Sequence, residues 1–84
     1  MDTFKFESFE EVVFALEGRL DVEFLLHEQR GWIGAHEDRQ LCMCGFPNHD
    51  SCVIFDTPDE VLDYDLGGGD TLRNVWLQLD LISL

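Results

Sequence analysis

Positive charge is scarce in this sequence, which has five Lys and Arg against 18 Asp and Glu and a formal net charge of −13. Phosphate groups would repel such a chain, so we expect no direct nucleic-acid binding and favour a basic protein partner. No run of about 18 apolar residues is present, and the opening residues lack a basic segment followed by an apolar one. We therefore expect neither a membrane span nor a signal peptide, and a cytoplasmic location.

Motifs typical of catalysis are missing as well. The glycines at 67–69 follow a predicted helix and lack the lysine and hydroxyl residue of a phosphate-binding loop. The zinc deaminase arrangement, H-x-E with a later P-C-x-x-C, is absent. The carboxylates lie on helix faces that we expect to be exposed, with no sign of a desolvated cleft that would shift their pKa values. We therefore expect a protein that is not an enzyme.

The composition is nevertheless that of a folded protein, because 45% of the 84 residues are hydrophobic and seven are Phe. We expect one domain over residues 1–84, with no internal repeat or long linker. A chain of this length buries only about 60 to 65% of the surface that it exposes when unfolded. Its core is therefore marginal, and a metal, a disulfide or a partner would add stability.

Capping signals predict the helices. The pattern S-x-x-E at residues 8–11 begins a helix with apolar residues three and four apart, which stops near Gly18. A second capping box at 57–60 begins a helix that ends before the glycines at 67–69. Residues 70–79 carry the pattern of a third helix.

Alternating apolar and polar residues predict strands between these helices, with a turn at residues 29–31 between the first two. The predicted strands cover residues 21–26, 32–35, 40–44 and 51–55. A short terminal strand near residues 79–82 is an additional option. The fold class is therefore α+β: a four-stranded antiparallel meander with an N-terminal helix and one or two C-terminal helices.

Three cysteines and a histidine fall within the stretch CMCGFPNHDSC. Alternate residues of a strand point the same way, so Cys42 and Cys44 present their sulfurs on one face, and Cys52 approaches them from the neighbouring strand. With His49 from the loop, this set predicts a tetrahedral site for a structural Zn²⁺, and His36 is the alternative fourth ligand. Four protein ligands leave no open position for catalysis.

The cysteine cluster is also compatible with two interpretations that need no metal. Free cysteines are common buried residues of strands, where they act as small hydrophobic side chains. A disulfide is the interpretation that the sequence favours least, because three is an odd number of cysteines and disulfides are rare in a reducing cytoplasm.

Acidic residues concentrate in the helical ends of the chain. In the second helix Asp59 and Asp63 are neighbours on one face, with carboxylates about 6 Å apart, close to the spacing of successive phosphates on a nucleic-acid strand. The opposing interpretation is an ordinary solvated helix face, although such faces mix both signs of charge. The residues that we expect to contact a partner are Glu10, Glu11, Asp56, Asp59, Glu60, Asp63 and Asp65.

With FESFEEVVFALEGRLDVEF near one end and FDTPDEVLDYDLGGGDTLRNVWLQLDLISL at the other, the chain resembles short uncharacterised proteins of Gram-positive bacteria and their phages. Its small size, acidity and clustered cysteines are similar to those of anti-CRISPR proteins, specifically a zinc-binding inhibitor of a type II CRISPR effector nuclease. The resemblance implies action in the bacterial host cell: binding a cationic surface of the guide-loaded nuclease and blocking target DNA. The alternative is a small acidic adaptor or regulatory protein that binds another basic protein.

Overall fold

The computed structural model describes residues 2–84 and contains a five-stranded antiparallel sheet with strand order β4-β3-β2-β1-β5. Its strands are β1 (Val22–Leu26), β2 (Gln29–Ala35), β3 (Leu41–Cys44), β4 (Cys52–Phe55) and β5 (Asp80–Ser83). The first four form the predicted meander, each paired with the next along the chain. The predicted number of strands is wrong, because β5 pairs with β1 and extends the sheet to five.

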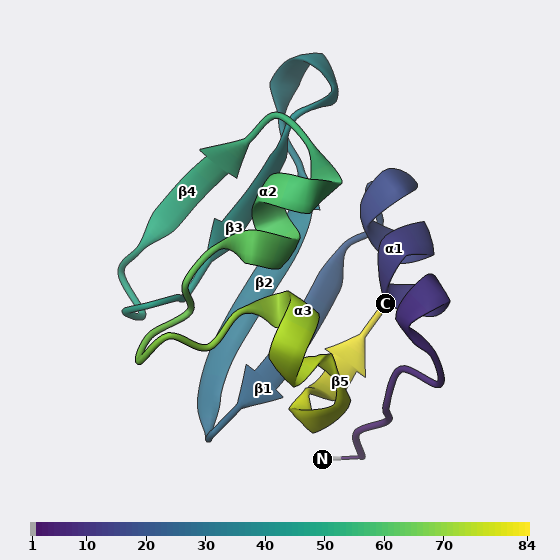
Figure 1. Ribbon diagram of the computed structural model, residues 1–84, viewed down its shortest axis with the longest axis vertical. Helices are drawn as coiled ribbons and strands as arrows, with labels where there is room; N and C mark the ends of the chain where they lie inside the picture. Colours follow the sequence, from purple (N-terminus) through teal and green to yellow (C-terminus); the bar gives the residue numbers. More distant parts are fainter. Residues whose placement is uncertain (1) are drawn as a thin grey trace.

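The α-helices lie on one face of the sheet (Figure 1). They are α1 (Phe9–Glu17), α2 (Pro58–Asp63) and α3 (Leu72–Val75). Of the short 3-10 turns, η1 (Glu37–Arg39) connects β2 to β3 and η2 (Trp76–Gln78) follows α3. Both predicted capping residues are confirmed: the hydroxyls of Ser8 and Thr57 accept hydrogen bonds from the backbone N–H groups of Glu11 and Glu60. The third helix is shorter than its predicted range, because α3 ends at Val75 and continues only as η2.

The turn between β1 and β2 lies earlier than the sequence predicts. His27 and Glu28 both have positive φ, 50° and 68°, which is the geometry of a two-residue hairpin turn that matches the twist of the strands. Gln29 therefore already belongs to β2 and pairs with Leu26. Its side-chain amide donates to the carbonyl oxygens of Gly45 (2.6 Å) and Pro47 (2.8 Å), which fixes the loop between β3 and β4.

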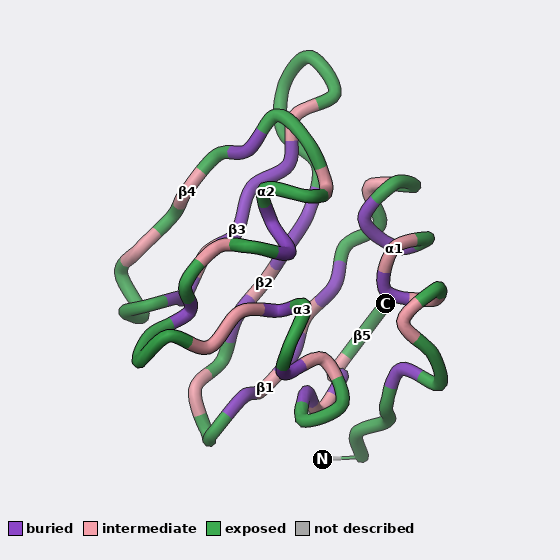
Figure 2. Tube along the Cα trace, viewed as in Figure 1, coloured by how far each residue is buried: buried purple, intermediate pink, exposed green. Residues whose placement is uncertain are grey.

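The core lies between the sheet and the helices, where Figure 2 shows the buried segments. Phe24, Leu41, Met43, Val61, Leu79 and Leu81 have no measurable exposure. Phe46, at the start of the loop after β3, turns into this core and stacks on Phe24 with ring centroids 5.5 Å apart. A side chain on Gly45 would meet the carbonyl oxygen of Arg30 at 2.4 Å, and its φ of 101° also requires glycine.

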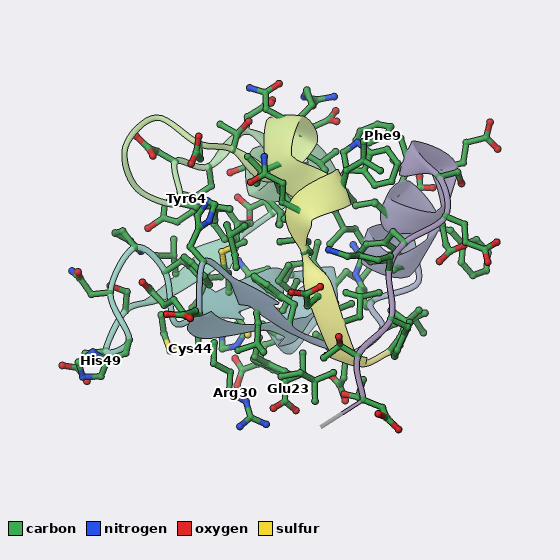
Figure 3. All side chains as sticks on the ribbon, turned by 90° about the horizontal axis from the view of Figure 1, so that it is seen from below. Phe9, Glu23, Arg30, Cys44, His49 and Tyr64 are labelled. Carbon is green, nitrogen blue, oxygen red and sulfur yellow. A yellow bond between two sulfur atoms is a disulfide. The ribbon has the colours of Figure 1, made fainter. Side chains whose placement is uncertain are left out.

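No helix of residues 2–84 covers the opposite face of the sheet, and Figure 3 shows Glu23, Arg30 and Cys44 pointing away from the helical layer. We call this surface the open face. Strand alternation and the register place Leu25, Trp32, Cys42, Cys44, Cys52 and Ile54 on it as well. Its β3 and β4 positions contain no charged side chain, which is unusual for a sheet face without a helix. No helix among residues 2–84 has the length and apolar character needed to cross a membrane.

Candidate functional site

The three cysteines lie on the open face, as their spacing predicts. Cys44 and Cys52 are direct cross-strand partners with Cα atoms 4.1 Å apart, and their sulfurs form a disulfide. A disulfide is the arrangement that the odd number of cysteines made least expected. The loop of residues 45–51 is responsible, because its length brings the two cysteines into register at the end of the β3–β4 hairpin.

Cys42 is free and buried, with 8% of its surface exposed. It lies one pair further along the ladder, opposite Ile54 and Gly34. Burial raises the pKa of the Cys42 thiol; a backbone hydrogen bond with Gly34 lowers it and the charge of Asp21 raises it further. The neutral thiol is therefore the favoured form, and Cys42 is a poor candidate for a reactive nucleophile.

The structure does not bring the two histidines to the sulfurs. His49 lies in the loop between β3 and β4, its side chain is 86% exposed, and its nearest charged neighbour is Asp50 at 3.3 Å. His36 precedes η1, at the end of β2 far from the disulfide in the register. Among residues 2–84 no group of three or more His, Cys, Asp or Glu side chains is arranged to hold a metal ion.

A shallow depression of about 480 Å³ lies on the open face beside the disulfide. It is lined by Glu23, Arg30, Gly31, Trp32, Cys44, Gly45 and His49. Arg30 and Glu23 form an ion pair across neighbouring strands, so the two charges in the depression largely cancel. The indole of Trp32 lies over Gly34, where an added Cβ would meet the ring at 2.3 Å. This surface is mainly apolar.

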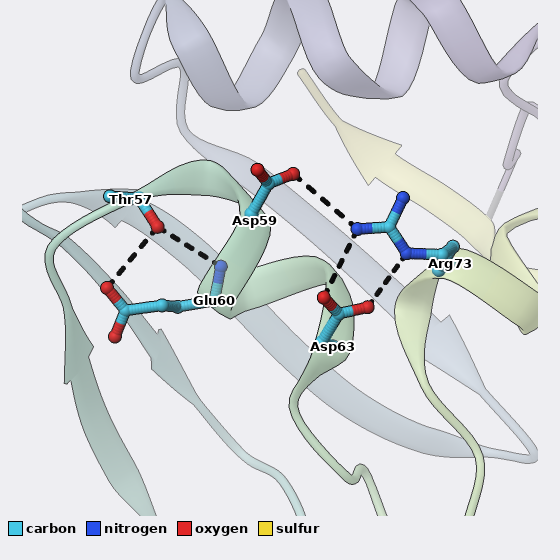
Figure 4. A network of polar contacts seen from close by, with 5 residues as sticks. All are labelled: Thr57, Asp59, Glu60, Asp63 and Arg73. Carbon is cyan, nitrogen blue, oxygen red and sulfur yellow. Dashed lines mark hydrogen bonds and ion pairs between the residues drawn. The ribbon is translucent and has the colours of Figure 1, made fainter.

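The acidic cluster of α2 has a cationic partner that the sequence pattern does not indicate. Arg73, on α3, donates from Nε to Asp63 at 2.7 Å and also contacts Asp59 at 3.5 Å (Figure 4). The glycines at 67–69 reverse the chain between the two helices, which brings Arg73 back to α2. The hydrogen bond from Arg73, together with its charge, lowers the pKa of Asp63, and Asp63 in turn raises the pKa of Arg73.

The remaining predicted contact residues near α2 also have local roles. Asp65 accepts hydrogen bonds from the N–H groups of Gly67 (2.7 Å) and Gly69 (3.1 Å) and so stabilises the turn. Asp56 accepts one from the side chain of Gln40 at 2.8 Å. The carboxylate of Glu60 accepts a hydrogen bond from the hydroxyl of Thr57, its capping residue, at 3.3 Å. The continuous row of free carboxylates expected on this helix is therefore interrupted by Arg73.

Glu10 and Glu11 occupy the first turn of α1, where negative charge interacts favourably with the helix dipole. Glu10 is exposed and Glu11 is half-buried. Within residues 2–84, carboxylates pair with Lys or Arg only at Glu23, Asp59, Asp63 and Asp80. Arg19 uses its guanidinium on the carbonyl oxygens of Glu17 and Arg39. Most of the negative charge is thus left without a cation.

Comparisons of the chain with protein-family models, with curated proteins and with solved structures found no match.

Proposed function

We propose that this protein is an acidic, non-enzymatic binding protein that docks on a basic surface of another protein. One observation carries the proposal: of 18 acidic residues, only four pair with Lys or Arg within the described chain. Uncompensated charge of this kind destabilises a compact chain through self-repulsion, but it speeds association with a cationic partner. A protein that bears this cost without a partner would gain only solubility.

The proposed contact residues remain Glu10, Glu11, Asp56, Asp59, Glu60, Asp63 and Asp65. Their contributions should differ, because Arg73 neutralises part of the charge on Asp59 and Asp63. Glu10 and Glu60 are exposed and have no cationic partner among residues 2–84. These two carboxylates should contribute more to binding than the pair held by Arg73.

The first partner to test is a type II CRISPR effector nuclease loaded with its guide RNA, as the resemblance implies. Such effectors hold the RNA–DNA heteroduplex in a positively charged channel. A chain with a net charge of −13 is attracted to that channel and would block the loading or cleavage of target DNA.

A cleavage assay tests this function, with the protein added before or after guide loading and before or after target DNA. We expect inhibition when the protein precedes the target, with an affinity that falls as salt is raised. Glu10→Gln with Glu60→Gln should weaken inhibition more than Asp59→Asn with Asp63→Asn, although both pairs remove the same charge. Full cleavage at large excess of protein would exclude that effector as the partner.

The alternative is an adaptor or regulatory protein for another basic protein. The pairing of Arg73 with Asp59 and Asp63 favours this alternative, because it breaks the phosphate-like row that a mimic of DNA would present. Capture of a basic host protein at low salt, with no effect on any effector tested, would support the adaptor.

We also propose that the reduced protein binds Zn²⁺ through Cys42, Cys44, His49 and Cys52. In the disulfide form the ligands do not fit the ion, because Cys44 and Cys52 are bonded to each other and His49 points into solvent. Reduction would leave three thiols on one face of a hairpin. Together with His49 they would make four ligands, and zinc bound by four protein ligands stabilises a fold. Native mass spectrometry of the reduced protein with added zinc should find about one ion per chain. Three freely titrating thiols in the presence of zinc would contradict the site.

A further inference from the structure

The two edges of the sheet are protected very differently. At β5, Phe4 of the N-terminal segment exchanges backbone hydrogen bonds with Leu81 at 3.1 and 2.7 Å. The pairing of β5 with β1 is also irregular, and Asp80 on this strand pairs with Lys5 at 2.8 Å. Bulges, charges and covering segments are the usual means by which proteins block the edges of sheets.

The edge at β4 has none of these features. Within residues 2–84 no segment pairs with the outer side of β4, and Figure 1 shows no element beyond it. Its pairing with β3 has no bulge. Residues 51–55 contain no charge and no proline, and Ile54 in this segment is 51% exposed.

The register identifies the backbone groups that this edge offers. The N–H of Gly45 donates to the carbonyl oxygen of Ser51 at 2.8 Å, so these two residues form a hydrogen-bonded pair. Pairs alternate along an antiparallel ladder, so Cys52 and Ile54 belong to non-hydrogen-bonded pairs. Their own N–H and C=O groups therefore point away from β3, toward the outer edge of the sheet, where no strand of residues 2–84 lies.

Two kinds of strand could pair with this edge: β4 of a second copy of the chain, or an extended segment of another protein. The charges beside β4 favour the second. Asp50 and Asp56 flank β4 and are exposed. A second copy of the chain, paired antiparallel about Val53 so that Cys52 faces Ile54, would place Asp50 opposite Asp56, and like charges facing each other across strands are destabilising. An extended segment with an apolar centre and basic ends would instead place opposite charges there.

We propose that the edge of β4 is a strand-addition site for an extended basic segment of a partner protein. The added strand pairs with the backbone of Cys52 and Ile54, and its apolar side chains cover Ile54 on the open face. Its Lys or Arg residues lie near Asp50 and Asp56. Main-chain hydrogen bonds supply affinity in this mode of recognition, and the side chains supply selectivity. The site does not depend on whether the partner is a CRISPR effector.

The experiment is an NMR titration of the isotope-labelled full chain, in its disulfide form, with short synthetic peptides. The probe peptide alternates valine and threonine between two terminal lysines. We expect shifts of the amide signals of Cys52 and Ile54, and an affinity that falls with salt. A peptide with terminal glutamates should bind about tenfold more weakly, and a peptide with N-methylated alternate amides should not bind.

Two protein variants provide the matched control. Ile54→Lys and Phe14→Lys each replace an exposed apolar residue by a lysine, but Phe14 is 71% exposed on α1, on the helical side of the sheet. Only Ile54→Lys should weaken peptide binding, by about tenfold. Ile54→Pro should abolish it, since proline removes an N–H that β3 does not use.

Several results would overturn the proposal. The proposal is wrong if no peptide shifts the amide signals of β4 while the spectrum remains that of a folded protein. Equal binding of the N-methylated peptide would show side-chain contacts without strand addition. Sedimentation that detects a dimer of the chain, disrupted by Ile54→Lys, would make a second copy the occupant of this edge.

Discussion

The two faces of the sheet use the same strands for different purposes. The covered face is apolar and closed: Phe24, Met43 and Leu81 have no exposure, and the helices above them carry six of the 18 acidic residues. The open face presents a disulfide, a tryptophan and an exposed isoleucine, with a single ion pair between Glu23 and Arg30 in its depression. Residues 29–55, which form most of it, carry three acids against two arginines.

This difference teaches that the apolar core and the acidic helices lie on one side of the sheet, whereas the disulfide and the exposed Ile54 lie on the other. A sheet face that served only as a solvated exterior would carry alternating polar residues along β3 and β4. Sulfur and isoleucine occupy those positions instead. Substitutions on the two faces should therefore have effects of different kinds and sizes.

The largest effect is expected in the covered face. Phe24→Ala removes a ring that is fully buried and stacked on Phe46, and should destabilise the fold by about 3–5 kcal/mol. That is a large part of the stability of a small domain. Ile54→Ala, on the open face, should cost less than about 1 kcal/mol, because half of the side chain is already in water. Urea unfolding measures both, and equal losses would remove the distinction between the faces.

The disulfide should have the next largest effect. Cys44 and Cys52 are eight residues apart, and closing a loop of that length stabilises a fold by about 2–3 kcal/mol. Cys44→Ser with Cys52→Ser should therefore lower the free energy of unfolding by this amount. The wild type should lose the same amount in reductant, and the double variant should be insensitive to it. If zinc binds the reduced chain, adding it with reductant should restore stability only where all three cysteines are present.

Two glycines of β2 provide a matched comparison of the faces. A Cβ at Gly31 would meet the rings of Phe46 and Phe24 at 2.5 and 2.7 Å inside the core, so Gly31→Ala should cost about 1–3 kcal/mol. A Cβ at Gly34 would meet the indole of Trp32 at 2.3 Å and a carboxylate oxygen of Asp21 at 2.7 Å, and both contacts are with the far ends of side chains, which can shift. Gly34→Ala should cost less than about 1 kcal/mol and shift tryptophan fluorescence to longer wavelength. A larger loss at Gly34 than at Gly31 would show that Trp32 is held rigidly.

Local chemistry explains which parts of this structure could be predicted from the sequence. The starts of α1 and α2 follow from Ser8 and Thr57, because a cap uses residues only three apart. The shared face of Cys42 and Cys44 follows from the two-residue period of a strand. The hairpin of β3 and β4 follows from its turn residues, which lie between two apolar runs.

Contacts between distant segments were not predictable in the same way. The pairing of β5 with β1 joins residues almost sixty positions apart, and four residues of alternating pattern cannot identify their partner. The disulfide depends on the exact register of Cys44 with Cys52, which a one-residue slip would destroy. Arg73 reaches Asp63 only because the glycine turn folds α3 back onto α2. The sequence shows the charged residues, but it does not show that the chain folds α3 back onto α2.

The smallest effect concerns this ion pair, which lies in the helical layer and lowers the negative charge there. Because Arg73 holds the pKa of Asp63 below its ordinary value of 3.8, the pairing stabilises the fold above that value and its contribution is lost as the pH falls through the folded pKa. Arg73→Gln should raise the midpoint of the Asp63 carboxyl, followed by NMR, toward 3.8. The stability difference between wild type and variant should be present at neutral pH and vanish in acid, while Glu60→Gln leaves the Asp63 titration unchanged. An unaltered Asp63 midpoint in Arg73→Gln would mean that the carboxylates of α2 are free after all, and that the helical layer offers a basic partner the unbroken acidic row that its sequence predicts.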